Sequence, residues 1–314
     1  MTAAAATRGP ESRATPPAER GYWGEAARAL LHDWTAVAGM LIVALLALSA
    51  ALAPLIAPYD PTFQHSTGLT LDGRPRTPGA DGFLLGTDEL GRDELSRLVY
   101  GARVSLVVGA TGTLLAAVLG VAWGAAAGMA RGLWQAVLMR MVDVILSFPT
   151  LLLAIALLAV TKPRMLTIIL IVGATFGAGL SRIVFSQVTS LREREFVVAA
   201  RASGVRSPMI VLRHIVPHLL PSVIVMSTLS VATIIMFEAG LSYVGIGIQP
   251  PQASWGNMIS SGQSYLLSDP WLIAVPAGSL VVTMIGFALL GDGLRDVLDP
   301  TLERQRGLVR TGLR

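Results

Sequence analysis

The sequence contains no cysteine, a single lysine and few charged residues of any kind. The absence of cysteine excludes disulfide bonds and thiol chemistry. The one lysine, Lys162, lies in the sequence TKPR, so the chain has no GxxxxGK[ST] phosphate-binding loop. If its function uses ATP, another chain must hydrolyse it. Charged residues make up 14% of the 314 residues and hydrophobic residues 53%. Soluble domains have about 25% charged residues, so this composition indicates a membrane protein.

Six segments are apolar and contain at most one ionisable residue, and we expect each to cross the membrane as an α-helix. The first is too long, and begins too far from the N-terminus, to be a signal peptide. The sequence therefore predicts an all-α membrane protein with six transmembrane helices. In chain order these are residues 35–57, 104–130, 144–161, 165–181, 219–243 and 271–291.

The remaining segments predict the orientation of the chain in the membrane. We expect a disordered N-terminal tail, two outer segments, one long inner loop and a basic C-terminal tail, with both termini in the cytoplasm. In this orientation, with the short connections 131–143 (inner) and 162–164 (outer) included, the inner segments carry 17 basic residues and the outer segments seven, as the positive-inside rule requires. The N-terminal tail is residues 1–33 and the C-terminal tail is residues 292–314. The outer segments are residues 59–103 and 245–270, and the inner loop is residues 182–218.

Glycines recur at four-residue spacing in two of the predicted spans. Gly120, Gly124 and Gly128 lie in the second span, and Gly173 and Gly177 lie in the fourth. Small residues at this spacing allow helix backbones to approach closely within lipid. We therefore interpret them as packing positions rather than ligand-binding positions.

No catalytic or metal-binding constellation is evident. Four carboxylates precede the second span in the sequence TDELGRDELSR. We interpret them as a solvated helix N-terminus, where acids interact favourably with the helix dipole. His214 and His218 are four residues apart, but Pro217 between them is expected to interrupt the helix. We therefore predict no metal site.

Residues 195–217 predict two short helices within the long inner loop. Gly204 is expected to end the first helix in a left-handed conformation. Ser207 is expected to cap the second helix, with Pro208 at its first position and Pro217 at its end. Composition alone leaves two interpretations open, which are an amphipathic hairpin on the membrane surface and a docking element for another protein.

The spacing of Ala199-Ala200, Gly204 and Pro217 resembles the Glu-Ala-Ala loop of ABC-importer permeases. The flanking sequences EFVVAARASG and RHIVPHLLPSVI are similar to those of the dipeptide, oligopeptide and nickel permeases, as is the sequence that precedes the second span. One departure is Val198, which stands where the family usually has its first glutamate.

This resemblance implies a type I ABC-importer permease fold in the bacterial inner membrane, with the loop forming a coupling helix. The chain would be one of two related permeases that form the pore in membrane lipid, beneath an extracytoplasmic binding protein. Two separate ATPase domains would hold ATP and magnesium, so this chain would be neither an enzyme nor a cofactor-binding or nucleic-acid-binding protein. The implied coupling residues are Glu195, Ala199, Ala200, Arg201, Gly204, Val205, Arg206 and Pro217.

The resemblance also implies a substrate class and a mechanism. The substrate would be a dipeptide, an oligopeptide, a nickel complex or a related small solute, carried by alternating access. Trp255 and Asn257 lie in an outer loop that resembles a segment facing the binding protein. Trp255 is alternatively an interfacial anchor.

Glu238 is an ionisable residue within the apolar fifth span. Such a residue normally faces protein or water rather than lipid. It either lines the translocation path or makes a structural hydrogen bond, and we favour the structural role. The alternative function, an ion-coupled secondary transporter acting alone, predicts inverted repeats and paired intramembrane charges. Glu238 is its one clear candidate among the central spans.

Overall fold

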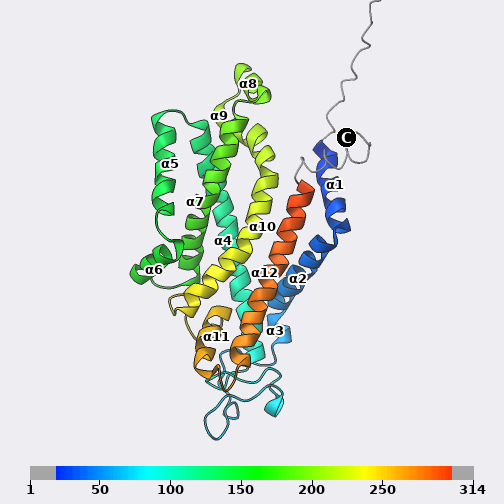
Figure 1. The fold of residues 1–314 in the computed structure, drawn as a ribbon, viewed down its shortest axis with the longest axis vertical. Coiled ribbons are helices and arrows are strands. Elements are labelled where there is room, and N and C mark those ends of the chain that lie inside the picture. Colours follow the sequence, from blue (N-terminus) through cyan, green and yellow to red (C-terminus); the bar gives the residue numbers. More distant parts are fainter. Residues whose placement is uncertain (1–18, 299–314) are drawn as a thin grey trace, which may run out of the picture.

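A computed structural model describes residues 19–298 of the protein. Within this range the chain consists of helices and loops, and its long helices run side by side along one axis (Figure 1). Five helices are long and apolar enough to cross a membrane, and the bent pair α5 and α6 can supply a sixth span. The predicted all-helical membrane fold is confirmed. The five are α2 (Trp34–Ala51), α4 (Glu94–Met129), α7 (Met165–Leu191), the run Ser207–Tyr243, which includes α10 (Val216–Tyr243), and α12 (Trp271–Leu298).

The segment predicted as the third span, residues 144–161, is not one straight helix. α5 (Leu133–Leu146) ends within it, and α6 (Thr150–Val160) leaves at an angle of 85°. Pro149 lies at the N-cap of α6. A proline disfavours the helical conformation in the residue before it, which explains a break at this point. The expectation of a single helix was wrong because it followed hydropathy and gave this proline no weight.

Four helices extend beyond the apolar segments that predicted them. α4 begins at Glu94 and α10 at Val216, while α7 continues to Leu191 and α12 to Leu298. Once a helix is nucleated, each further residue adds a hydrogen bond, and polar side chains at its ends do not stop it. Hydropathy located the apolar parts of these helices but underestimated their length. The predicted loop 182–218 therefore begins as helix, because its first ten residues belong to α7.

The structure describes only parts of the two predicted tails. α1 (Glu19–His32) is helical, although residues 1–33 were expected to be disordered. Residues 1–18 and 299–314 lie outside the described residues. α1 and the C-terminal end of α12 lie at the same end of the bundle (Figure 1).

α4 and α7 pack against each other over much of their length. Their backbones approach closely at the predicted glycines. A Cβ atom on Gly120 would lie 2.9 Å from the Cβ of Leu180, and one on Gly124 would lie 2.7 Å from the Cβ of Val184. Real Cβ atoms do not approach so closely, so no larger residue fits without a shift. The structure confirms the packing role predicted for these glycines.

Three of the four carboxylates that precede the second span are buried, namely Asp88, Asp93 and Glu94, so the expectation of a solvated helix N-terminus was wrong in this respect. Asp88 forms ion pairs with Arg92 at 2.5 Å and with Arg97 at 3.0 Å, and all three side chains are at most 5% exposed. Asp93 does cap α4, because its carboxylate accepts a hydrogen bond from the Ser96 backbone N–H at 2.7 Å. The two arginines of the same stretch supply the counter-charges that make the burial of Asp88 tolerable.

We predict that Gly124→Ala destabilises the protein through the α4–α7 contact. The added methyl group overpacks the contact, which costs about 1–3 kcal/mol. At roughly 2–4 °C for each kcal/mol, the apparent unfolding temperature of the purified chain in detergent should fall by several degrees. The matched control is Gly278→Ala, because a Cβ atom there meets nothing within 4 Å. Equal unfolding temperatures for the two variants would contradict the packing role.

Candidate functional site

The most distinctive feature outside the bundle is a hairpin, residues 195–210, made of α8 (Glu195–Ala202) and α9 (Ser207–Ile210). It projects past the ends of the long helices, at the same end as α1 (Figure 1). This is the segment that the sequence predicted as a helix–turn–helix. Its two halves are joined by a turn at Ser203–Arg206.

The turn of the hairpin is a Schellman motif centred on Gly204. Gly204 has φ +80°, and its N–H donates to the carbonyl of Arg201 at 3.0 Å. The N–H of Val205 donates to the carbonyl of Ala200 at 3.1 Å. These two bonds satisfy carbonyls that a helix end would otherwise leave unpaired. The left-handed conformation predicted for Gly204 is confirmed. Glycine is favoured here by the backbone conformation and not by lack of space, since a Cβ atom added here would meet nothing within 4 Å.

The second half of the hairpin differs from the prediction at both ends. Arg206, not Ser207, occupies the N-cap position, and no side chain caps the helix, although Pro208 does lie in its first turn. Pro217 does not end the helix. A π-helical turn at Val211–Ile215 is followed directly by α10, in whose first turn Pro217 lies.

The π turn explains how a proline is accommodated here. The N–H of Val216 bonds to the carbonyl of Val211, five residues earlier, so the hydrogen-bond pattern shifts immediately before Pro217. A proline in the first turn of the α-helix that follows costs little, because it lacks only an N–H that has no required partner. The helical run from Ser207 to Tyr243 is therefore continuous.

The hairpin is attached to the bundle by an apolar core and an aromatic stack. Val197, Ile210 and Ile215 are fully buried against residues of α7 and α10. The ring of Phe196 stacks on the ring of His218 in α10, with centroids 5.0 Å apart and planes 15° apart. The sequence did not reveal this pair, because the two residues meet only once the hairpin has folded back.

Arg192 joins the end of α7 to the end of α4. Its guanidinium donates hydrogen bonds to the carbonyls of Gly128 at 2.8 Å and Ala130 at 3.1 Å. These are carbonyls that the C-terminus of α4 cannot pair within the helix. The predicted coupling residues did not include Arg192, although it lies just before the hairpin.

Most of the predicted coupling residues lie on the outer surface of the hairpin. Ala200 and Val205 are half-buried and the other six are exposed. Two apolar side chains, Val198 and Met209, are about half exposed beside them. A projecting surface that mixes apolar and basic side chains is suited to docking against another protein.

Glu238 is fully buried between α4 and α10. Its carboxylate accepts hydrogen bonds from the hydroxyl of Ser105 in α4 at 2.9 Å and from that of Ser242 at 2.7 Å. The Ser242 oxygen in turn accepts from the N–H of Ile248 at 3.0 Å. Glu238 thus links two spans and the following loop, an arrangement that agrees with the structural interpretation.

Trp255 and Asn257 are buried, so neither offers a surface to a binding protein in this conformation. They begin α11 (Trp255–Gly262) and are 1% and 7% exposed. The Trp255 indole N–H donates to the carbonyl of Leu98 in α4 at 3.1 Å, and the Asn257 side chain completes a capping box with Ser254. Because α11 folds inward against the spans, the contact with a binding protein stays a prediction.

Among the described residues, no group of three or more histidine, aspartate or glutamate side chains could hold a metal ion. His214 and His218 share a continuous helix, but the His218 ring bonds the carbonyl of His214 at 2.6 Å rather than a common ligand.

Comparison with known proteins decides the family. Residues 120–304 match the binding-protein-dependent transport system inner membrane component, and residues 21–72 match the N-terminal TM domain of oligopeptide transport permease C. The chain belongs to this permease family. As a member of it, the protein is a multi-pass inner-membrane component of an ABC transport system rather than a member of an enzyme family.

Relatives of this permease are similar over nearly their whole length. It is 37% identical to the oligopeptide transport system permease protein OppC of Bacillus subtilis, over 90% of each chain. It is 38% identical to OppC of Escherichia coli K12, over 90% of this chain and 92% of that one. It is 36% identical to the dipeptide transport system permease protein DppC of Alkalihalophilus pseudofirmus, over 94% and 96%.

A solved structure shows the same fold for the permease core. In an inward-facing structure of the MetNI methionine ABC transporter, one chain superposes with a TM-score of 0.52 at 18% identity, over 65% of this chain and 97% of that one.

We predict that Glu238→Ala destabilises the permease while Glu238→Gln does so much less. Alanine leaves the buried hydroxyl groups of Ser105 and Ser242 without their acceptor, at a cost of about 1–3 kcal/mol. Glutamine retains an acceptor oxygen. Thermal unfolding of the two purified variants measures the difference. If both unfold like the wild type and only transport is lost, Glu238 belongs to the translocation path instead.

Proposed function

We propose that this permease forms half of the translocation pore of an ATP-driven importer for dipeptides or oligopeptides. The observation that carries the proposal is the projecting hairpin, which continues without interruption into a membrane-spanning helix. The family membership and the similarity to proteins named as oligopeptide and dipeptide permeases support the substrate class.

The proposed partners are a second, related permease, two ATPase domains and an extracytoplasmic substrate-binding protein. A separate ATPase agrees with the absence of a phosphate-binding loop in this chain. Both termini are proposed to be cytoplasmic. In support, α1, the end of α12 and the hairpin lie at one end of the bundle (Figure 1), and the segments on that side hold most of the basic residues.

In the proposed mechanism, the hairpin transmits movement of the ATPase domains to the spans. ATP binding closes the ATPase domains and draws the hairpins of the two permeases together. Because Ser207–Tyr243 is one continuous helical run, displacement of the hairpin tilts α10 rather than bending a flexible linker. α10 packs against α4 and α12, so these spans tilt with it. The pore then opens outward to receive substrate, and hydrolysis returns it to the inward-facing state.

The alternative of an ion-coupled transporter acting alone has less support. It requires paired charges within the spans, and the hydrogen-bond partners of Glu238 are serines. No feature of the described residues favours it over the importer.

Purification of the full chain from its native host in mild detergent tests the proposed function. We expect a second permease and P-loop ATPases to co-purify, and the complex to hydrolyse ATP faster when a peptide-loaded binding protein is added. A well-folded chain that purifies alone and shows no ATPase activity would refute the importer assignment.

We predict that Gly204→Val uncouples this complex without preventing membrane insertion. A β-branched residue in the left-handed conformation costs about 1–2 kcal/mol, which lowers the ratio of folded to unfolded turn by roughly 5- to 30-fold. Peptide-stimulated ATP turnover should fall accordingly. The matched control is Gly204→Asn, because asparagine tolerates this conformation. Normal turnover in Gly204→Val would refute the role of the turn.

A further inference from the structure

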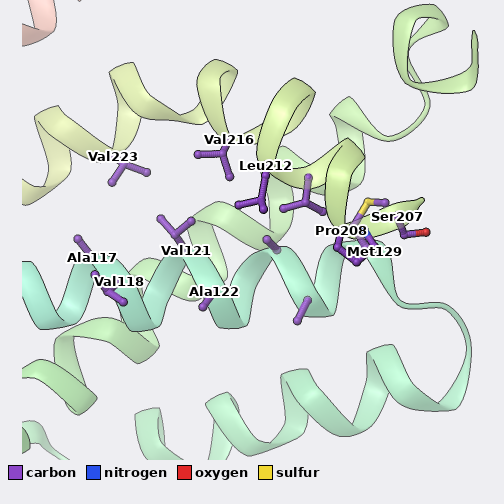
Figure 2. A pocket seen from close by; sticks show the side chains of 13 residues that line it. Ala117, Val118, Val121, Ala122, Met129, Ser207, Pro208, Leu212, Val216 and Val223 are labelled. Carbon is purple, nitrogen blue, oxygen red and sulfur yellow. The ribbon is translucent and has the colours of Figure 1, made fainter. Parts of the chain in front are cut away.

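An apolar groove of about 740 Å³ lies between α4 and the helical run that begins at Ser207. Figure 2 shows its two walls, with residues of α4 on one side and Pro208, Leu212, Val216 and Val223 on the other. Ser207 is the one polar residue among those that line it, and the groove is open on one side rather than enclosed. No side chain among the residues that the structure describes fills this volume.

The position of the groove indicates that its occupant comes from the membrane. Its α4 wall extends from Ala117 to Met129, within the charge-free segment 104–130. Twelve residues of helix rise about 18 Å, which is close to the hydrocarbon depth of one leaflet, roughly half of about 30 Å. The groove therefore matches the length and the depth of a single acyl chain.

Three arginines lie close in the sequence to residues that line the end of the groove nearest to the hairpin. Arg131 follows Met129 by two residues, Arg206 precedes Ser207, and Arg213 follows Leu212. All three are exposed, and none forms an ion pair with the described residues. Segments 117–131 and 206–223 contain no acidic residue. This end is thus complementary to a phosphate group, and basic pockets between spans bind anionic lipid headgroups.

We propose that the groove binds one acyl chain of an anionic phospholipid, whose phosphate lies between Arg131 and Arg213. A peptide would leave its backbone N–H and C=O groups unpaired against this apolar lining, which is costly. A helix of another membrane chain could use the alanines of the α4 wall for close packing. A helix would make no use of the positive charge at this end, whereas a lipid phosphate is attracted to it, and for this reason the lipid is favoured.

The first test is lipid retention by the purified full chain, together with whatever subunits accompany it, measured by native mass spectrometry. The probes are phosphatidylglycerol and phosphatidylethanolamine, added separately after delipidation. We expect bound phosphatidylglycerol in the wild type and a loss of about tenfold or more in Ala126→Trp, because the indole occupies space that the acyl chain needs. Leu114→Trp is the matched control, since Leu114 is exposed on α4 outside the groove. Equal retention by the two tryptophan variants would overturn the proposal.

A second pair of variants tests the headgroup contact without changing the shape of the groove. Arg131→Gln and Arg213→Gln should each lower the preference for phosphatidylglycerol over phosphatidylethanolamine by roughly fivefold. Arg140→Gln is the control, because this exposed arginine is not among the residues next to the groove. An unchanged preference in the first two variants would refute the contact with phosphate.

The third test separates a lipid from a helix as the occupant. A photoreactive diazirine side chain placed at Val121, in the α4 wall (Figure 2), is irradiated in native membranes. We expect the cross-linked product to carry phospholipid, detected by mass spectrometry of the digested chain. A cross-link to another membrane protein instead would overturn the proposal.

Discussion

The close approach of α4 and α7 is the constraint on which the rest of the bundle depends. Between spans in lipid there is little hydrophobic driving force, so the pair is held by van der Waals contact at small residues. The glycines of α4 lie against Leu180 and Val184 of α7 without room for a methyl group. This contact brings the ends of the two helices together, where Arg192 bonds the last carbonyls of α4.

The hairpin depends on this arrangement. Its apolar core includes Val188 of α7 and Leu219 of α10 as well as its own Val197 and Ile210. The hairpin therefore packs directly against the bundle. The π turn then allows Pro217 within a continuous helical run, so that the second half of the hairpin and α10 belong to one run.

Buried polar groups stabilise the opposite end of the bundle. Asp88 pairs with two arginines at the start of α4, and Glu238 joins α4 to α10 through two serines. Trp255 anchors α11 to the carbonyl of Leu98. These contacts all involve the N-terminal part of α4, so that α4 is connected to the other elements at both of its ends. Buried polar groups have a high cost when unpaired and give directional contacts when paired.

The sequence alone determined the membrane class, the number of apolar segments, the glycine packing and the left-handed turn at Gly204. Each of these follows from local chemistry, namely hydropathy, residue size at a fixed spacing, or the backbone freedom of one glycine. The tertiary structure decided what local chemistry cannot. Whether the charges near Asp88 are solvated or buried depends on which counter-charges meet them, and whether Trp255 faces a partner depends on how α11 folds back. Likewise, Pro217 can end a helix or lie within one. The π turn decides between these outcomes, because it shifts the hydrogen-bond pattern immediately before the proline. One residue after the proline, the ring of His218 stacks on the ring of Phe196.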